Sequence, residues 1–219
     1  MLFQDRFDAG RLLASKLRSF ANRPGTVVLA LPRGGVPVGF EVAKALNVPL
    51  DVFVVRKLGV PGHEELAMGA IASGGIRVLN EDVVRAAGIP DDVIDAVAAE
   101  EERELERRER DYRDDRPPVD VKGRIVILVD DGLATGSSMR VAVLALKRKR
   151  PAQIVVAVPV GAPTTCAEFE SEVDQTICAV TPEPFQSVGQ WYRDFSQTSD
   201  EEVRDLLKRA ASLPTPSAA

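Results

Sequence analysis

Residues 124–140 read RIVILVDDGLATGSSMR and contain the features from which the fold can be predicted. The apolar run at 125–129 predicts a strand buried on both faces, as in a parallel sheet. Two adjacent carboxylates, Asp130 and Asp131, follow the run, and a loop of small and hydroxyl residues occupies 132–138. A helical pattern then begins, so its amino-terminal end points at the loop. The stretch therefore predicts a strand, a loop and a helix of an α/β sheet.

The loop and the acidic residues before it predict a site for a phosphorylated sugar. Backbone N–H groups at a helix amino terminus bind anions, and the hydroxyls of Thr135, Ser137 and Ser138 can add donors. Two carboxylates beside them can hold vicinal hydroxyls or a hydrated Mg²⁺. The plain alternative is an ordinary strand–turn–helix with an acidic turn. A Walker loop is excluded because no Lys precedes the hydroxyl pair, and the spacing is not that of a Rossmann glycine fingerprint.

The whole stretch resembles the ribose-phosphate signature of the type I phosphoribosyltransferases. The resemblance implies that Asp130 and Asp131 bind the ribose 2- and 3-hydroxyls of 5-phosphoribosyl 1-diphosphate (PRPP) and hold Mg²⁺ through water. It also implies that the 5-phosphate is wrapped by the loop residues Ala134, Thr135, Gly136, Ser137 and Ser138. The resemblance covers roughly residues 25–180, and the chain as a whole most resembles bacterial proteins with a phosphoribosyltransferase domain.

A second strand end, at 31–35, reads LPRGG. Two glycines let the backbone approach a ligand closely, and Arg33 offers a forked donor for a phosphate. In the family, the loop after the first core strand binds the pyrophosphate of PRPP, so the resemblance implies this role for Arg33, Gly34 and Gly35. Taken alone, the motif is more often only a turn.

A third strand end carries two cations, Arg56 and Lys57, followed by a segment rich in Gly and Pro at 58–65. This segment resembles the flexible catalytic loop of the family, especially in its adenine-type members. The resemblance implies that Arg56 and Lys57 are catalytic and face the pyrophosphate, while the loop closes and excludes water. The alternative is a solvated strand end. The single histidine, His63, is expected to be a surface residue.

Aromatic residues gather at 182–195 in a chain that is only 5% aromatic. The family places a variable hood over the acceptor, so the resemblance makes Trp191 and Tyr192 candidates to stack on an acceptor base. A small satellite core that packs this segment onto the sheet is an equally good interpretation. Ala134 stands where the hypoxanthine/guanine-type enzymes usually have Asp, which argues against that subclass and leaves the acceptor open.

Composition indicates one α/β domain without a membrane or nucleic-acid surface. The chain has 219 residues, 45% of them hydrophobic, and a net charge of −5, which disfavours binding to nucleic acid. No apolar run is long enough to span a membrane, and the charged amino terminus argues against a signal peptide, so a cytoplasmic location is expected. Cys166 and Cys178 offer neither metal spacing nor a disulfide framework and are expected to lie reduced, in or near the core.

Strand and helix patterns alternate along the chain, which predicts a mostly parallel, twisted sheet flanked by helices. We expect a single phosphoribosyltransferase-like domain at 1–211, with a helical insertion at about 81–116, a small C-terminal hood at about 182–200 and a disordered tail at 212–219. The charged helix within the insertion carries a narrow apolar stripe, which favours a lid support or a homodimer contact over a nucleic-acid arm.

The function expected from these features is Mg²⁺-dependent transfer of a 5-phosphoribosyl group from PRPP to a small nitrogen acceptor, preferably a nucleobase, with release of pyrophosphate. The alternative is a regulatory protein of the same fold that senses PRPP or a nucleotide with little or no transferase activity. A sugar-phosphate phosphatase or an ATPase has less support, because the chain lacks a Walker Lys and a clear nucleophile motif.

Overall fold

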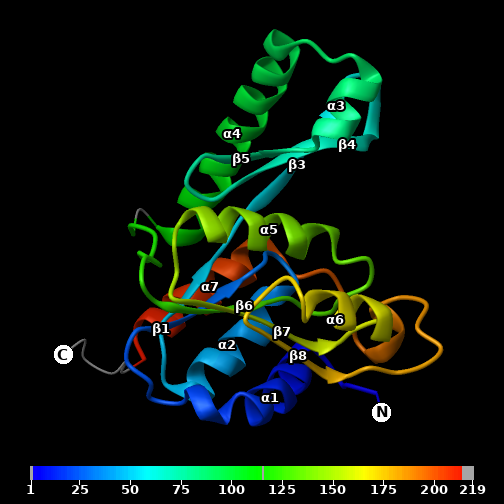
Figure 1. Cartoon of the computed structure of the whole chain (residues 1–219). Helices are drawn as coiled ribbons and strands as arrows, with labels where there is room; N and C mark the ends of the chain where they lie inside the picture. Colours follow the sequence, from blue (N-terminus) through cyan, green and yellow to red (C-terminus); the bar gives the residue numbers. More distant parts are fainter. Residues whose placement is uncertain (1, 115, 214–219) are drawn as a thin grey trace.

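A parallel sheet forms the centre of the computed structural model, which describes residues 2–114 and 116–213 (Figure 1). Its five strands lie in the order β2-β1-β6-β7-β8, and every neighbouring pair is parallel. The strands are β1 (Thr26–Ala30), β2 (Leu50–Val52), β6 (Ile125–Val129), β7 (Gln153–Val160) and β8 (Gln175–Val180). The predicted α/β fold with a mostly parallel sheet is thus confirmed, and the 125–129 strand is its central strand.

Helices cover both faces of this sheet. They are α1 (Arg6–Lys16) and α2 (Gly35–Leu46) on one face, and α5 (Ser137–Arg148) and α6 (Pro163–Phe169) on the other (Figure 1). All residues of β6 are buried, with Val126 and Leu128 in the core on the α5 side and Ile127 and Val129 in the core on the α1 side. A strand buried on both faces must be apolar at every position, which explains the continuous run.

An arm projects from the sheet edge that carries β2. We use this name for residues 55–113, which comprise β3 (Val55–Val60), β4 (His63–Ala72), β5 (Ile76–Leu79), α3 (Glu81–Ala87) and α4 (Asp91–Arg113). The three strands form a separate antiparallel sheet, and the arm stands above α5 in Figure 1. The helical insertion expected at about 81–116 is therefore a pair of helices that packs with the preceding strands; residue 115 lies outside the described residues.

The segment 58–65, expected to be an irregular loop, is mostly a β-hairpin. β3 and β4 pair on either side of a short turn at 61–62. The expectation was wrong because Leu58 and Val60, two positions apart on one strand face, are both buried in a core cluster that includes α4. This alternation is the period of a strand, and the intervening glycine hides it.

A buried ion pair ties the arm to the parallel sheet. Arg113, the last residue of α4, donates from Nε to Oδ1 of Asp51 at 2.8 Å and from Nη2 to the Val52 carbonyl at 2.9 Å. The other oxygen of Asp51 accepts the backbone N–H of Val119 at 2.9 Å. The two side chains are only 7% and 8% exposed, so each buried charge depends on the other. The root of the arm is therefore fixed on β2.

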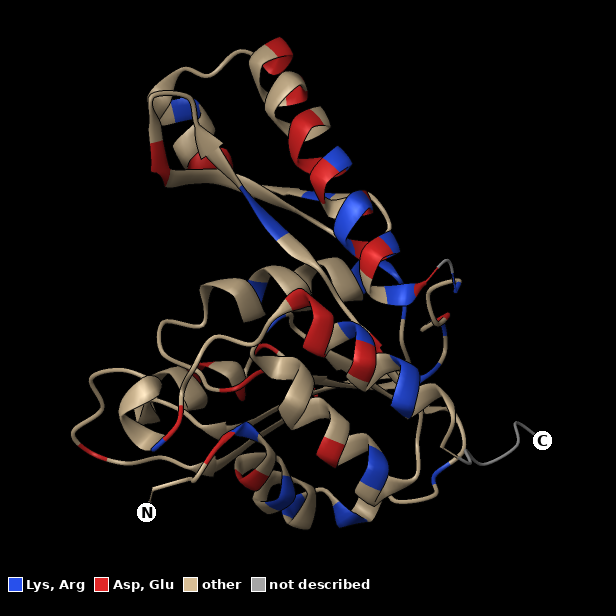
Figure 2. Cartoon of the chain, turned by 180° about the vertical axis from the view of Figure 1, so that it is seen from behind, with Lys and Arg blue, Asp and Glu red and all other residues tan. Residues whose placement is uncertain are grey.

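The C-terminal segment returns to the sheet and covers its edge. It contains the short helix η2 (Gly189–Trp191) and α7 (Asp200–Ala211), while η1 (Arg18–Phe20) lies near the amino terminus. α7 packs on α2 and α4. Both acidic and basic residues lie along α4, as Figure 2 shows. The tail expected at 212–219 lies outside the described residues from 214 onward. Within the described ranges, no helix is both long and apolar enough to cross a membrane.

Candidate active site

The 134–138 loop, which ends in the first two residues of α5, lies in the connection from β6 to α5 and is supported by α6. Gly136 has a φ of +73°, and a Cβ there would lie 2.7 Å from the Phe169 ring. The hydroxyl of Thr165 donates to the Ala134 carbonyl at 2.7 Å. Only glycine suits position 136, because a side chain would be strained in φ and would also overlap α6. The backbone of the loop is therefore fixed before any ligand arrives.

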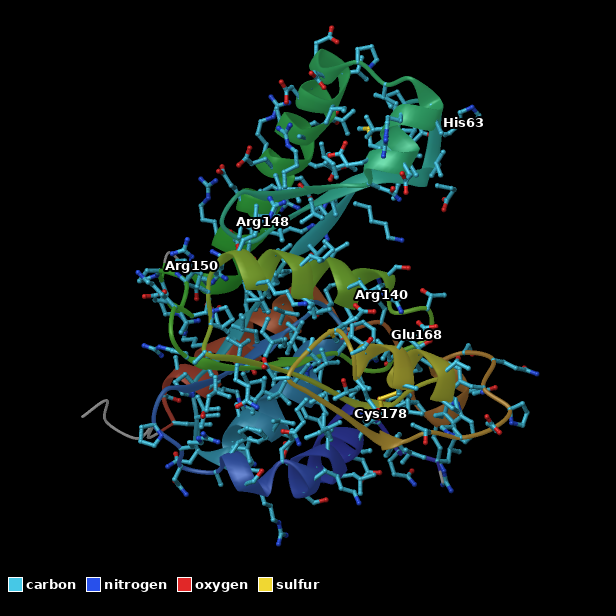
Figure 3. All side chains as sticks on the ribbon, viewed as in Figure 1. His63, Arg140, Arg148, Arg150, Glu168 and Cys178 are labelled. Carbon is cyan, nitrogen blue, oxygen red and sulfur yellow. A yellow bond between two sulfur atoms is a disulfide. The ribbon has the colours of Figure 1, made fainter. Side chains whose placement is uncertain are left out.

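Arg140 supports the same loop from α5. Its Nη1 donates to the Thr135 carbonyl at 2.8 Å, and its Nε donates to Glu172 at 2.9 Å. It also pairs with Glu168, which lies beside it in Figure 3. Sequence reasoning did not select Arg140 or Thr165, because the Arg140–Glu172 and Thr165–Ala134 contacts join residues about thirty positions apart along the chain.

A cavity of about 190 Å³ lies over this loop at the carboxyl end of β6. It is lined by Lys57, Asp130, Gly132, Leu133, Ala134, Thr135, Gly136, Ser137, Ser138, Met139 and Val188. Ser137 and Ser138 open α5, so the free N–H groups of its first turn lie at the cavity. The five expected loop residues are thus brought together at a site suited to an anion.

The acidic pair, Asp130 and Asp131, lies at the end of β6, and the positive charge of Arg6 is bonded to Asp131. Oδ1 of Asp130 accepts the Asp131 N–H at 2.8 Å, and Oδ2 of Asp131 accepts Nε of Arg6 at 2.8 Å. Burial raises the pKa of both carboxyls, and the neighbouring charge of Asp131 raises the pKa of Asp130 further. Hydrogen bonding to Arg6 works in the opposite direction on the pKa of Asp131. The chain therefore maintains two acidic groups where burial disfavours their charge.

The expected pyrophosphate loop packs directly on this acidic pair. The Pro32–Arg33 peptide is cis, and Gly34 follows it with helical backbone angles. A Cβ at Gly34 would overlap Oδ2 of Asp131, and one at Gly35 would lie 3.0 Å from the Asp130 Cα. Both glycines are needed for this close approach. The Arg33 side chain lies near α7, where its Nη1 is 3.8 Å from Oδ1 of Asp200.

Arg56 and Lys57, expected to act together at a strand end, lie within β3 and are separated. Lys57 lines the cavity. Arg56 donates to Glu101 of α4 at 2.6 Å. Successive side chains on a strand point to opposite faces, which accounts for the different surroundings of Arg56 and Lys57. In this structure Arg56 is bonded within the arm, and its expected role at the pyrophosphate stays a prediction.

Tyr192 is a packing residue rather than an exposed aromatic surface. It is 6% exposed, and its ring lies between Phe3 and Phe195, with ring centres 5.3 and 5.0 Å away. Its hydroxyl donates to the Asp131 carbonyl at 2.5 Å. A buried ring cannot stack on an acceptor, so the satellite-core interpretation holds for Tyr192. Trp191 is only partly buried, and its expected stacking role remains a prediction.

The two cysteines form a disulfide, contrary to the expectation of reduced thiols. Cys166 of α6 is bonded to Cys178 of β8, 12 residues further along the chain (Figure 3). The sequence does not reveal this pairing, because it depends on the packing of α6 against the edge strand β8. The bond connects the helix that supports the 134–138 loop to the sheet.

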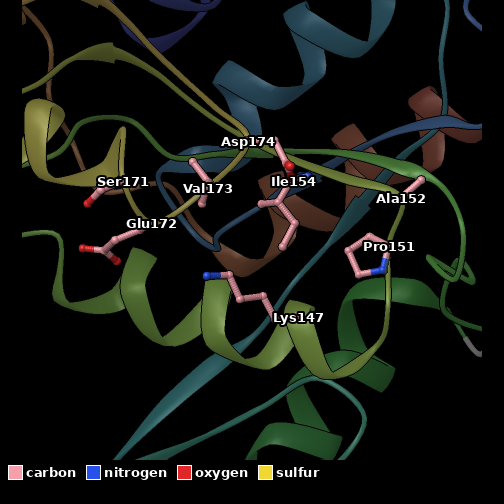
Figure 4. Close-up of a pocket in the computed structure, with 8 residues that line it drawn as sticks. All are labelled: Lys147, Pro151, Ala152, Ile154, Ser171, Glu172, Val173 and Asp174. Atoms are coloured by element: carbon pink, nitrogen blue, oxygen red, sulfur yellow. Dashed lines mark hydrogen bonds between the residues drawn. The ribbon is translucent and has the colours of Figure 1, made fainter.

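A larger cavity of about 350 Å³ lies at the opposite end of the strands from this site (Figure 4). Its lining residues are Lys147, Pro151, Ala152, Ile154, Ser171, Glu172, Val173 and Asp174. They precede or begin β7 and β8, so the cavity is at the amino ends of these strands. Ligands of parallel α/β sheets bind at the carboxyl ends, which favours the smaller cavity as the active site.

A metal ion at this site would take some of its ligand atoms from a bound substrate. Across residues 2–114 and 116–213, no group of three or more His, Cys, Asp or Glu side chains could hold a metal. Mg²⁺ in proteins usually keeps several waters and binds through one or two carboxylates together with substrate phosphates. Asp130 and Asp131 beside an anion cavity fit that mode of binding.

Comparison with known proteins agrees with this geometry. A family model described as the phosphoribosyl transferase domain matches residues 4–186. The chain belongs to this family. It is 49% identical over 209 residues to MT0597 and Rv0571c of Mycobacterium tuberculosis, whose names assign them provisionally as phosphoribosyl transferases. The alignment covers 95% of this chain and 47% of each relative, so the chain spans about half the length of these relatives.

A solved structure of similar architecture is that of TT1426 from Thermus thermophilus. It is 40% identical to this chain, with a TM-score of 0.82, and the match covers 95% of this chain and 99% of TT1426. The likeness extends over nearly the whole of both chains, so this phosphoribosyl transferase-family protein shares its architecture with TT1426 beyond the central sheet.

Proposed function

We propose that this protein transfers a 5-phosphoribosyl group from PRPP to a nitrogen acceptor and releases pyrophosphate, with Mg²⁺ as cofactor. The observation that carries the proposal is that Asp130, whose Oδ1 accepts the Asp131 N–H, lines the anion cavity of the 134–138 loop at one strand end. Family membership supports the same reaction. A nucleobase acceptor and a cytoplasmic location belong to the proposal.

The proposed substrate position follows from the charges and donors around the cavity. The 5-phosphate accepts hydrogen bonds from the first turn of α5 and the hydroxyls of the 134–138 loop. The ribose hydroxyls donate to Asp130 and Asp131. The pyrophosphate lies toward the 33–35 loop and Lys57, the cation that lines the cavity.

Catalysis in this arrangement depends on position and charge. As the bond between C1 and the pyrophosphate oxygen breaks, the ribose ring gains positive character, and the carboxylates of Asp130 and Asp131 stabilise it. When bound, Mg²⁺ would neutralise charge on the leaving group. The acceptor nitrogen then forms the new bond to C1, and its proton is lost to solvent. No covalent protein intermediate is required.

Thermal stability provides the first test. PRPP with Mg²⁺ should raise the Tm, because a ligand that binds only the native state stabilises it, by about 2.7 kcal/mol at a hundred times its Kd. Differential scanning fluorimetry would measure the shift, with ribose 5-phosphate as the comparison ligand. An unchanged Tm at millimolar PRPP would contradict the proposal. Pyrophosphate release with a panel of purines, pyrimidines and amines would then separate an enzyme from a sensor.

Lys57 should contribute mainly to the diphosphate end of the substrate. Lys57→Met keeps the aliphatic stem and removes one charge, so PRPP affinity should fall about tenfold while ribose 5-phosphate affinity stays nearly unchanged. Arg56→Met removes the same charge one position away, where the side chain is bound to Glu101, and should cost clearly less. Isothermal titration calorimetry would compare the variants. Equal losses for both would show that Lys57 has no special position.

A further inference from the structure

We propose that Arg6 is a positioning residue for ribose recognition, which holds the Asp131 carboxylate so that its second oxygen can accept a substrate hydroxyl. The inference rests on the proposed function, because it concerns the same acidic pair. Arg6 lies in the first turn of α1, 125 positions from Asp131 along the chain. Nothing in the motif at 124–140 points to it.

Three contacts fix the Arg6 guanidinium. Its Nε donates to Oδ2 of Asp131 at 2.8 Å, and its Nη1 donates to the Ser196 carbonyl at 2.7 Å. Its central carbon lies 4.0 Å from the centre of the Phe195 ring. The side chains of Arg6 and Asp131 are 11% and 16% exposed. Asp131 is therefore bonded to an anchored cation and not to a mobile surface side chain.

The backbone around Asp131 is fixed as well. Its carbonyl accepts the Tyr192 hydroxyl, and its N–H donates to Oδ1 of Asp130. The backbone of Gly34 lies so close to Oδ2 that no side chain would fit between them. With Oδ2 enclosed by Arg6 and the 33–35 loop, Oδ1 of Asp131 is the oxygen available to a ribose hydroxyl.

Charge balance gives Arg6 a second effect on the pair. Asp130 and Asp131 are adjacent like charges in a partly buried place, and Arg6 is the cation bonded to one of them. Lys57 and Asp130 both line the cavity. Arg6 thus offsets the repulsion between the carboxylates and keeps Asp131 from rotating away from Asp130.

Substitution of Arg6 tests the proposal by calorimetry. Arg6→Gln should weaken both PRPP and ribose 5-phosphate about tenfold, since both ligands carry the hydroxyls, and Arg6→Lys should recover part of the loss. The matched control is Arg11→Gln on the same helix, where the side chain is 57% exposed and pairs with Asp8; its affinities should equal those of the wild type. Unchanged affinity in Arg6→Gln would overturn the proposal.

A double-mutant cycle separates positioning from a general loss of structure. If Arg6 acts through Asp131, Arg6→Gln should change PRPP affinity less than about twofold in an Asp131→Asn background. An equal loss in both backgrounds would overturn the inference and leave the proposed function standing, because the wild type would still bind PRPP. Absence of PRPP binding by the wild type would overturn both.

Discussion

Replacing Asp130 and Asp131 together by Asn should slow pyrophosphate release by on the order of a hundredfold or more. The amides keep the size of the side chains but remove the two charges that, in the proposed mechanism, stabilise the ribose as it becomes positive. They also weaken the acceptors for its hydroxyls. Initial rates with saturating Mg²⁺ and a chosen acceptor would measure the effect, and wild-type turnover in this double variant would show that the pair is only an acidic turn.

Lower protein stability should not account for the slower pyrophosphate release of this variant. A carboxyl whose pKa is raised on folding stabilises the native state only while protonated, below its ordinary pKa, and this contribution is lost as pH rises through the raised value. Burial raises the pKa of Asp130, so at neutral pH Asp130→Asn should leave the Tm equal or higher. Asp82→Asn is the matched control for the rate, because that side chain is 93% exposed on the arm and pairs only locally.

Gly34→Ala should lower kcat/KM for PRPP by on the order of a hundredfold, because small displacements of positioning groups have effects of that size. Gly34 has φ −61° and ψ −32°, which alanine adopts without strain, so the cause would be steric alone. The new Cβ would overlap Oδ2 of Asp131 and lie 3.2 Å from Nε of Arg6. Either the carboxylate or the 33–35 loop must move, and both belong to the proposed substrate site.

Gly88→Ala provides the comparison for this variant. A Cβ at Gly88 meets nothing within 4 Å, and the residue lies on the arm between α3 and α4. This control should lose some stability through its positive φ but keep the wild-type kcat/KM. Steady-state kinetics and thermal melts on both variants would separate the two effects. Wild-type kcat/KM in Gly34→Ala would mean that Asp131 does not need its observed position.

The central strand and its loop could be predicted because their signals are local. An apolar run, two carboxylates, a glycine and the start of a helix follow one another within 124–140, and each acts on its immediate neighbours. Gly34 and Gly35 follow β1, the strand beside β6 in the sheet. Their place near the acidic pair could be predicted because parallel strands present their carboxyl ends at the same edge of a sheet. The hairpin at 58–65 escaped prediction because its strand period is interrupted by glycine and depends on burial against α4.

Hydrophobic period and chain order are enough to predict the parallel sheet, the loop after β6 and the adjacent carboxylates. The packing of distant segments determines which side chains support that pair and the 134–138 loop. Arg6, Tyr192 and Thr165 reach the site from distant segments, and Lys57 rather than Arg56 faces the cavity. The physical reason is that hydrogen bonds and ion pairs between elements depend on which faces pack together, and short-range patterns do not encode that choice.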